Sequence, residues 1–107
     1  MQTLFNQGKS QLTYPIKLVY IQTQTERKFP AQSMFVVPKK SFKKAHDRNK
    51  LKRRMREAFR LNKTEFYQKL QNENKLMNLA FIFISKKSES YQSIEKATKA
   101  LLIKAGG

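Results

Sequence analysis

Runs of apolar residues divide the chain into three segments with the composition of β-strands. They are rich in β-branched and aromatic residues and are bounded by polar or proline-containing sequence, as strands commonly are. These segments are residues 14–22 (YPIKLVYIQ), 32–37 (QSMFVV) and 79–85 (LAFIFIS). The third is apolar almost throughout, which predicts a central strand covered on both faces.

Apolar residues at helical spacing predict the remaining elements. Residues 1–7 are expected to form a short helix that stops at Gly8, and residues 90–104 a closing amphipathic helix. A long helical region, broken or bent around residues 62–64, joins the second and third strands. The order α-β-β-α-β-α predicts a single α+β domain over residues 1–107, a sandwich of helices packed on a small sheet.

A basic helix is predicted from about Ala45 to Leu61. At about 100° per residue, one arc of this helix faces the core, and its members are Leu51, Met55, Ala58 and Phe59. A second arc points away from the core and holds Asn49, Lys52, Arg53, Arg56 and Arg60. Asp47 is expected as the N-cap or a first-turn acid, and Glu57 as the ion-pair partner of Arg53 or Arg60.

Positive charge is concentrated rather than spread along the chain. Lys and Arg total 23 against seven acids, for a formal charge of +16. Residues 39–60 hold eleven of the basic residues, with only Asp47 and Glu57 as acids. Like charges four residues apart on a helix repel one another, so a bound polyanion is the expected partner. Nucleic acid is favoured over a merely solvated helix face.

Other classes of function find less support. The single histidine, His46, and the scattered acids suggest no catalytic pair or metal site. The absence of cysteine excludes disulfides, and no apolar run reaches membrane-spanning length, so a soluble cytoplasmic protein is expected. A DNA-binding helix module is disfavoured by the three strands. A membrane-surface protein is disfavoured because the apolar arc is needed for the core. A structural, ribosomal-type RNA-binding protein stays open.

The run VPKKSFKKAHDRNKLKRRMREAFR, residues 37–60, resembles the signature of the bacterial ribonuclease P protein component. Upstream, LFNQGKS and YPIKLVY look like the end of that family's first helix and its first strand. The matching positions of the central motif are Lys39, Lys40, Ala45, Arg48, Asn49, Lys50, Lys52, Arg53, Arg56 and Glu57.

The resemblance implies a partnership with RNA. The family pairs one small basic protein with a large RNA subunit, and the complex removes the 5′ leader of precursor tRNA. The RNA subunit performs the hydrolysis with bound Mg²⁺, so the protein alone is expected to be inactive and to hold no metal by its side chains. A monomeric protein, one per RNA, is expected, with no DNA or membrane partner. The resemblance also implies a left-handed βαβ crossover.

The resemblance further assigns roles to residues. The RNA subunit is expected to contact Arg48, Asn49, Lys50, Lys52, Arg53, Arg56 and Arg60. The single-stranded leader is expected in a cleft with Phe5, Lys17 and Val19, where an aromatic can stack on a base of any sequence. Auxiliary phosphate contacts are expected from Lys39, Lys40, Lys43 and Lys44. Two departures are Lys50, where the family commonly has Arg, and the few residues before Phe5, where relatives usually carry a fuller basic helix.

Overall fold

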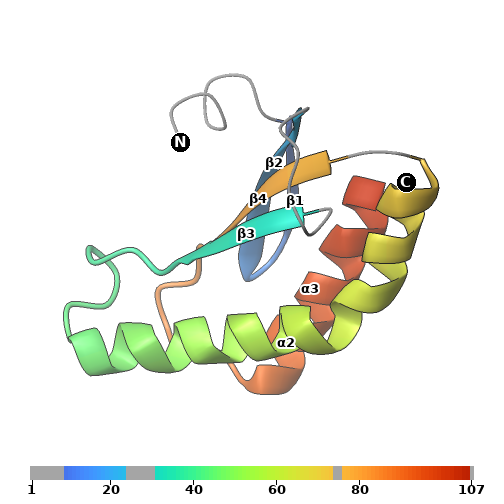
Figure 1. Ribbon diagram of the computed structural model, residues 1–107. Coiled ribbons are helices and arrows are strands. Elements are labelled where there is room, and N and C mark those ends of the chain that lie inside the picture. The colour runs from blue at the N-terminus through green and yellow to red at the C-terminus, as the bar shows by residue number, and fades with distance from the viewer. Residues whose placement is uncertain (1–8, 24–30, 74–75, 107) are drawn as a thin grey trace.

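The computed structural model describes residues 9–23, 31–73 and 76–106 (Figure 1). These residues form a four-stranded sheet and two helices. In chain order the elements are β1 (Lys9–Thr13), β2 (Ile16–Thr23), β3 (Ala31–Val36), α2 (Ala45–Asn72), β4 (Leu76–Phe83) and α3 (Tyr91–Gly106). The α+β class predicted from the sequence is confirmed. The predicted N-terminal helix and Phe5 lie outside the described residues.

The sheet has the strand order β1-β2-β4-β3. β2 pairs antiparallel with both β1 and β4, whereas β3 runs parallel to β4. A parallel pair needs a crossover connection, and α2 provides it between β3 and β4. The prediction that the apolar third segment is a central strand is confirmed, since β4 has a neighbour on each side. The expected cover on both faces is not found among the described residues, because Asn78 and Ile82 on the face opposite the helices are only half-buried.

Both helices pack on one face of this sheet (Figure 1). The apolar arc predicted for the basic helix is buried there, and Leu51, Met55 and Ala58 are each at most 1% exposed. The closing helix contributes Ile94 and Leu101, which are fully buried. Alternation along β2 sends Ile16 and Leu18 into the same core, because successive strand residues point to opposite faces. The helix layer thereby fixes the direction of every polar residue on α2.

One strand was not predicted from the sequence. β1 (KSQLT) carries a single apolar residue, Leu12, which is exposed, so no apolar alternation marks the segment as a strand. Its conformation comes from antiparallel pairing with β2, from Lys9 opposite Tyr20 to Thr13 opposite Ile16. The observed order of described elements is therefore β-β-β-α-β-α.

The predicted interruption of the long helical region is a bend and not a break. α2 is one helix of 28 residues, and Figure 1 shows its axis changing direction where green passes into yellow. The Asn62 side chain lies in this stretch, and its Nδ2 donates to the Ala58 carbonyl at 2.8 Å. A side chain that bonds to the carbonyl four residues back commonly bends a helix. The basic helix thus continues well past Leu61.

Candidate nucleic-acid interface

The N-terminal half of α2 presents the cations of the predicted outward arc. Because Leu51, Met55 and Phe59 are buried beneath the helix, the arc about a third of a turn away is left at the surface. Asn49, Arg53, Arg56 and Arg60 are exposed, and Lys52 is half-buried. Lys50 is exposed as well. The structure therefore places this predicted set on one rigid element.

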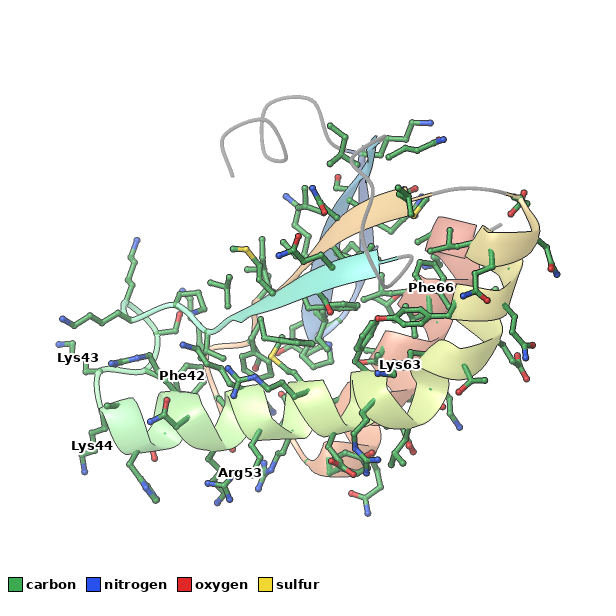
Figure 2. All side chains as sticks on the ribbon, viewed as in Figure 1. Phe42, Lys43, Lys44, Arg53, Lys63 and Phe66 are labelled. Atoms are coloured by element: carbon green, nitrogen blue, oxygen red, sulfur yellow. The ribbon has the colours of Figure 1, made fainter. Side chains whose placement is uncertain are left out.

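The loop that precedes α2 brings further cations to the same end of the helix. The carbonyl of Pro38 accepts the backbone N–H groups of Ser41 and Phe42, each at 3.2 Å. The Phe42 ring packs on Phe83 with ring centroids 5.7 Å apart, which anchors the loop to the core. The four predicted auxiliary residues, Lys39, Lys40, Lys43 and Lys44, are left exposed. Figure 2 shows Lys43 and Lys44 beside the first turn of α2, and Arg53 on the side of the helix away from the sheet.

Arg48 has a structural contact that the sequence did not reveal. Its Nη1 donates to the carbonyl oxygen of Phe42 at 2.7 Å and to that of Lys43 at 2.9 Å. No side chain caps the N-terminus of α2 at Lys44, and Asp47 is a first-turn acid, one of its two expected roles. The Arg48 guanidinium therefore ties the lysine loop to the helix.

Glu57 pairs with Arg60, one of the two partners predicted for it. The Arg60 Nη2 lies 2.5 Å from Glu57 Oε1, and Nε donates to Oε2 at 3.3 Å. This hydrogen bond from Arg60 lowers the pKa of the Glu57 carboxyl below its ordinary value. Glu57 is consequently ionised at neutral pH and offsets part of the positive charge at the C-terminal end of the arc.

Arg54 supports the site structurally, and sequence analysis missed this role. Its Nη1 donates to the carbonyl of Glu89 at 2.5 Å and lies 3.5 Å from Ser88 Oγ. At about 100° per residue, Arg54 falls outside both arcs of the helix. It fastens α2 to the loop before α3 and so steadies the helix that carries the cations.

The predicted leader-binding residues on β2 lie on the other side of the molecule. Lys17 and Val19 alternate with the core residues Ile16 and Leu18, so they belong to the sheet face opposite the helices. Lys17 is exposed, whereas Val19 is buried in a small apolar cluster with Ala80. Partly buried side chains surround this cluster: Ile21, Met34 and Ile82. The structure thus brings Lys17 and Val19 to one face and separates them from the cationic arc.

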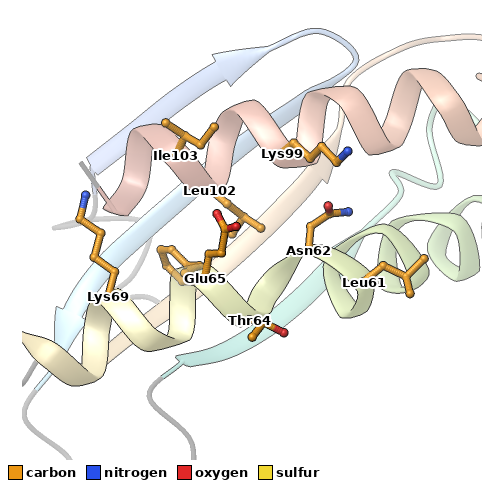
Figure 3. A pocket seen from close by; sticks show the side chains of 9 residues that line it. Leu61, Asn62, Thr64, Glu65, Lys69, Lys99, Leu102 and Ile103 are labelled. Atoms are coloured by element: carbon orange, nitrogen blue, oxygen red, sulfur yellow. The ribbon is translucent and has the colours of Figure 1, made fainter.

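A second group of cations lies away from the arc. Lys69 and Lys99 line a hollow of about 620 Å³ between the C-terminal part of α2 and α3, together with Glu65 (Figure 3). Two exposed apolar side chains, Leu61 and Ile103, also line it. These lysines have an acid among them and no helical face in common with Arg53, which makes them a useful comparison for the arc.

Among the described residues, no helix is long and apolar enough to cross a membrane. In the same part of the chain, no group of three or more His, Cys, Asp and Glu side chains could hold a metal ion.

A small α+β domain with a concentrated cationic helix and loop is typical of basic proteins whose partners are polyanions. Comparison with known proteins gives the family. The family model described as Ribonuclease P matches residues 1–106. The ribonuclease P protein component of Porphyromonas gingivalis, in each of two strains, is 35% identical over 108 residues, covering all of this chain and 78% of that protein. The chain belongs to the ribonuclease P protein family.

Solved structures of ribonuclease P proteins share the fold. The Staphylococcus aureus protein matches with a TM-score of 0.76 and 20% identity, over 97% of this chain and 86% of that one. The Thermotoga maritima protein matches with a TM-score of 0.71 and 22% identity, over 96% of this chain and 88% of that one. At this level of identity the likeness supports the architecture, including β1.

Proposed function

We propose that this chain is the protein subunit of a ribonuclease P ribonucleoprotein and docks on the RNA subunit through α2. The observation that carries the proposal is the exposure of Asn49, Arg53 and Arg56 on one rigid face. Arg guanidinium groups match phosphate oxygens in a two-pronged geometry, and Asn can bridge a phosphate or a 2′-hydroxyl. Membership of the family supports the choice of RNA partner.

The lysine loop extends this docking surface. Lys39, Lys40, Lys43 and Lys44 are exposed at the end of α2 where the arc begins. Lysine contributes a compact charge with less geometric selectivity than arginine. The loop therefore adds counterion release and attraction to the backbone, while the arginines and Asn49 fix the orientation on the RNA.

The sheet face opposite α2 and α3 is proposed to bind the 5′ leader of precursor tRNA. Lys17 offers a charge to the leader backbone, and the apolar cluster around Val19 offers a surface for bases. Stacking and charge of this kind are tolerant of sequence, which suits a leader that differs between precursors. Because this face is separate from the arc, one protein can hold both RNAs simultaneously.

Leader removal is assigned to the RNA subunit, whose bound Mg²⁺ supplies the hydrolytic chemistry. The contribution of the chain is positive charge placed between two polyanions, which eases their repulsion and raises the local concentration of substrate. One monomer per RNA subunit satisfies this arrangement, and the assembly is proposed to act in the cytoplasm. The alternative is a structural RNA-binding protein with no part in cleavage.

Reconstitution separates these two functions. The purified chain is mixed with a bacterial ribonuclease P RNA and precursor tRNA at low Mg²⁺, and the 5′ ends are mapped. We expect no cleavage by the protein alone, slow cleavage by the RNA alone, and rapid cleavage at the mature 5′ end with both. If the chain binds the RNA and leaves the rate and its Mg²⁺ dependence unchanged, the structural alternative holds.

A further inference from the structure

The turn between β1 and β2 carries an exposed aromatic residue, Tyr14, which is 60% exposed. It is the one aromatic among the large apolar side chains found exposed in the described part of the chain, the others being Leu12, Leu61, Ile84 and Ile103. Single exposed apolar residues are common on protein surfaces and by themselves call for no function. Tyr14 differs from the other four because a hydrogen bond holds its side chain in place.

A buried hydroxyl anchors the Tyr14 ring at its tip. The Tyr14 hydroxyl donates to Ser85 Oγ at 2.9 Å, and Ser85 is only 1% exposed. Ser85 Oγ also accepts the backbone N–H of Lys87 at 3.2 Å and lies 3.0 Å from the Glu89 carboxylate. Arg54 holds the carbonyl of Glu89 in turn. The exposed ring is therefore pre-positioned, so a partner that stacks on it loses little side-chain freedom in doing so.

Lysines belong to the segments that adjoin this ring. Tyr14 and Lys96 line a shared hollow of about 270 Å³ with Thr13 and Ser93. Lys104 Nζ donates to Thr13 Oγ1 at 3.0 Å. The backbone N–H of Lys87 donates to the Ser85 hydroxyl that also binds Tyr14, so the exposed Lys87 side chain belongs to the loop that anchors the ring. The acid among these groups is Glu89, whose carboxylate already lies against Ser85. The local balance is positive beside an aromatic face.

We propose that Tyr14 is a stacking platform for an unpaired RNA base, with the phosphates on either side near Lys87, Lys96 and Lys104. Aromatic rings flanked by cations are the usual means of holding single-stranded nucleic acid without sequence preference. The platform lies at the turn between β1 and β2, beside α3, so it is distinct from the α2 arc and from the face that carries Lys17. The inference rests on the proposed function and adds a third RNA contact to it.

A fluorescence experiment tests stacking directly. The chain contains no tryptophan, so Tyr14→Trp introduces a single reporter, and Ile103→Trp is the control because Ile103 is 74% exposed on α3. Each variant is titrated at low salt with a short single-stranded RNA oligonucleotide. We expect the base to quench the tryptophan at position 14 and to leave the one at position 103 largely unchanged. Equal quenching, or none at either position, would overturn the platform.

Affinity measurements separate the contribution of the aromatic ring from that of its hydrogen bond to Ser85. Tyr14→Leu removes the aromatic face, whereas Tyr14→Phe retains it and loses the hydrogen bond to Ser85. Loss of one stacked base should weaken binding on the order of 5- to 150-fold for Tyr14→Leu, and Tyr14→Phe should stay close to the parent. Equal losses in the two variants would mean that the tyrosine serves only the Ser85 loop, and the inference would fail.

The RNA used in each arm identifies where the base comes from. A loss confined to precursor tRNA, measured with the holoenzyme against mature tRNA, assigns the platform to the leader. A loss in binding of the RNA subunit assigns it to an unpaired segment of that RNA. If the parent binds both RNAs and Tyr14→Leu matches it throughout, this inference alone fails. If the parent binds neither RNA, the proposed function fails with it.

Discussion

Replacing Arg48 with Ala should release the lysine loop from α2. The Arg48 guanidinium bridges the carbonyls of Phe42 and Lys43 at 2.7 and 2.9 Å, the first bond half-buried and the second exposed. A hydrogen bond from a charged donor contributes roughly 1.5–3 kcal/mol when well shielded and less at the surface. The pair should therefore stabilise the fold by about 1–2 kcal/mol, which corresponds to about 5–10 °C in Tm for a domain of this size.

Thermal unfolding and hydrogen exchange measure this effect. Arg48→Ala should lower Tm and reduce the protection of the backbone amides of Ser41 and Phe42, which bond to the Pro38 carbonyl. Arg48→Lys keeps the charge, but an ammonium group cannot reproduce the planar fork, so it should recover only part of the loss. Arg53→Ala is the matched control, because Arg53 is exposed on the same helix and its removal should leave Tm unchanged.

Binding to the RNA subunit then shows whether the two hydrogen bonds of Arg48 position the lysine loop for RNA. If Arg48 positions the loop, Arg48→Lys should weaken binding to the RNA subunit more than Arg53→Lys does, although both keep the net charge. A parent-like Tm and parent-like exchange in Arg48→Ala would refute the reasoning. In that case the two hydrogen bonds contribute nothing measurable, and Arg48 acts solely as a phosphate contact.

Two further predictions concern single charges on the proposed RNA surfaces. Glu57→Gln removes a negative charge and frees Arg60, so RNA affinity should rise and the salt dependence should steepen by about one unit; an unchanged affinity would mean that Arg60 makes no RNA contact. Because its pKa is lowered, Glu57 is protonated only below the ordinary carboxyl range, so the difference between parent and Glu57→Gln should vanish only at such acidic pH. Lys17→Ala should reduce the preference of the holoenzyme for precursor over mature tRNA in competition assays, while binding of the RNA subunit stays the same; loss of both together would contradict the separation of the two surfaces.

The helical layer and the inner strands were predictable from the sequence because periodicity reports burial. Leu51, Met55, Ala58 and Phe59 share an arc of the helical wheel, and all four are buried. β1 was not predictable in this way, since its conformation depends on pairing with β2 and its own residues are mostly polar. The predicted third strand included Ser85, whereas β4 ends at Phe83. The Ser85 hydroxyl instead accepts a hydrogen bond from Tyr14, a contact between segments far apart in the sequence.

The contacts of the candidate site likewise differ in whether a local sequence pattern predicts them. The direction of Arg53 and Arg56 follows from the wheel, which also gave Arg60 as one of two possible partners of Glu57. The contacts of Arg48 and Arg54 depend on where two loops lie after folding, which no local pattern encodes. One signal was present for Arg48: at about 100° per residue it falls within the core arc, between the buried Met55 and Phe59, so its side chain starts on the side that faces the protein.

The central claim is that the outward arc of α2 docks on the RNA subunit, and a salt titration of binding tests it most directly. The double variant Arg53→Ala, Arg56→Ala is compared with the parent and with Lys69→Ala, Lys99→Ala, which removes the same charge from the hollow between the helices. Each lost contact should cost on the order of 1–3 kcal/mol of binding and about one unit of salt slope. We expect the arginine pair to weaken binding far more than the lysine pair, with the fold of both variants intact. Equal effects from the two pairs, or parent-like binding by the arginine variant, would contradict the docking of α2 on RNA.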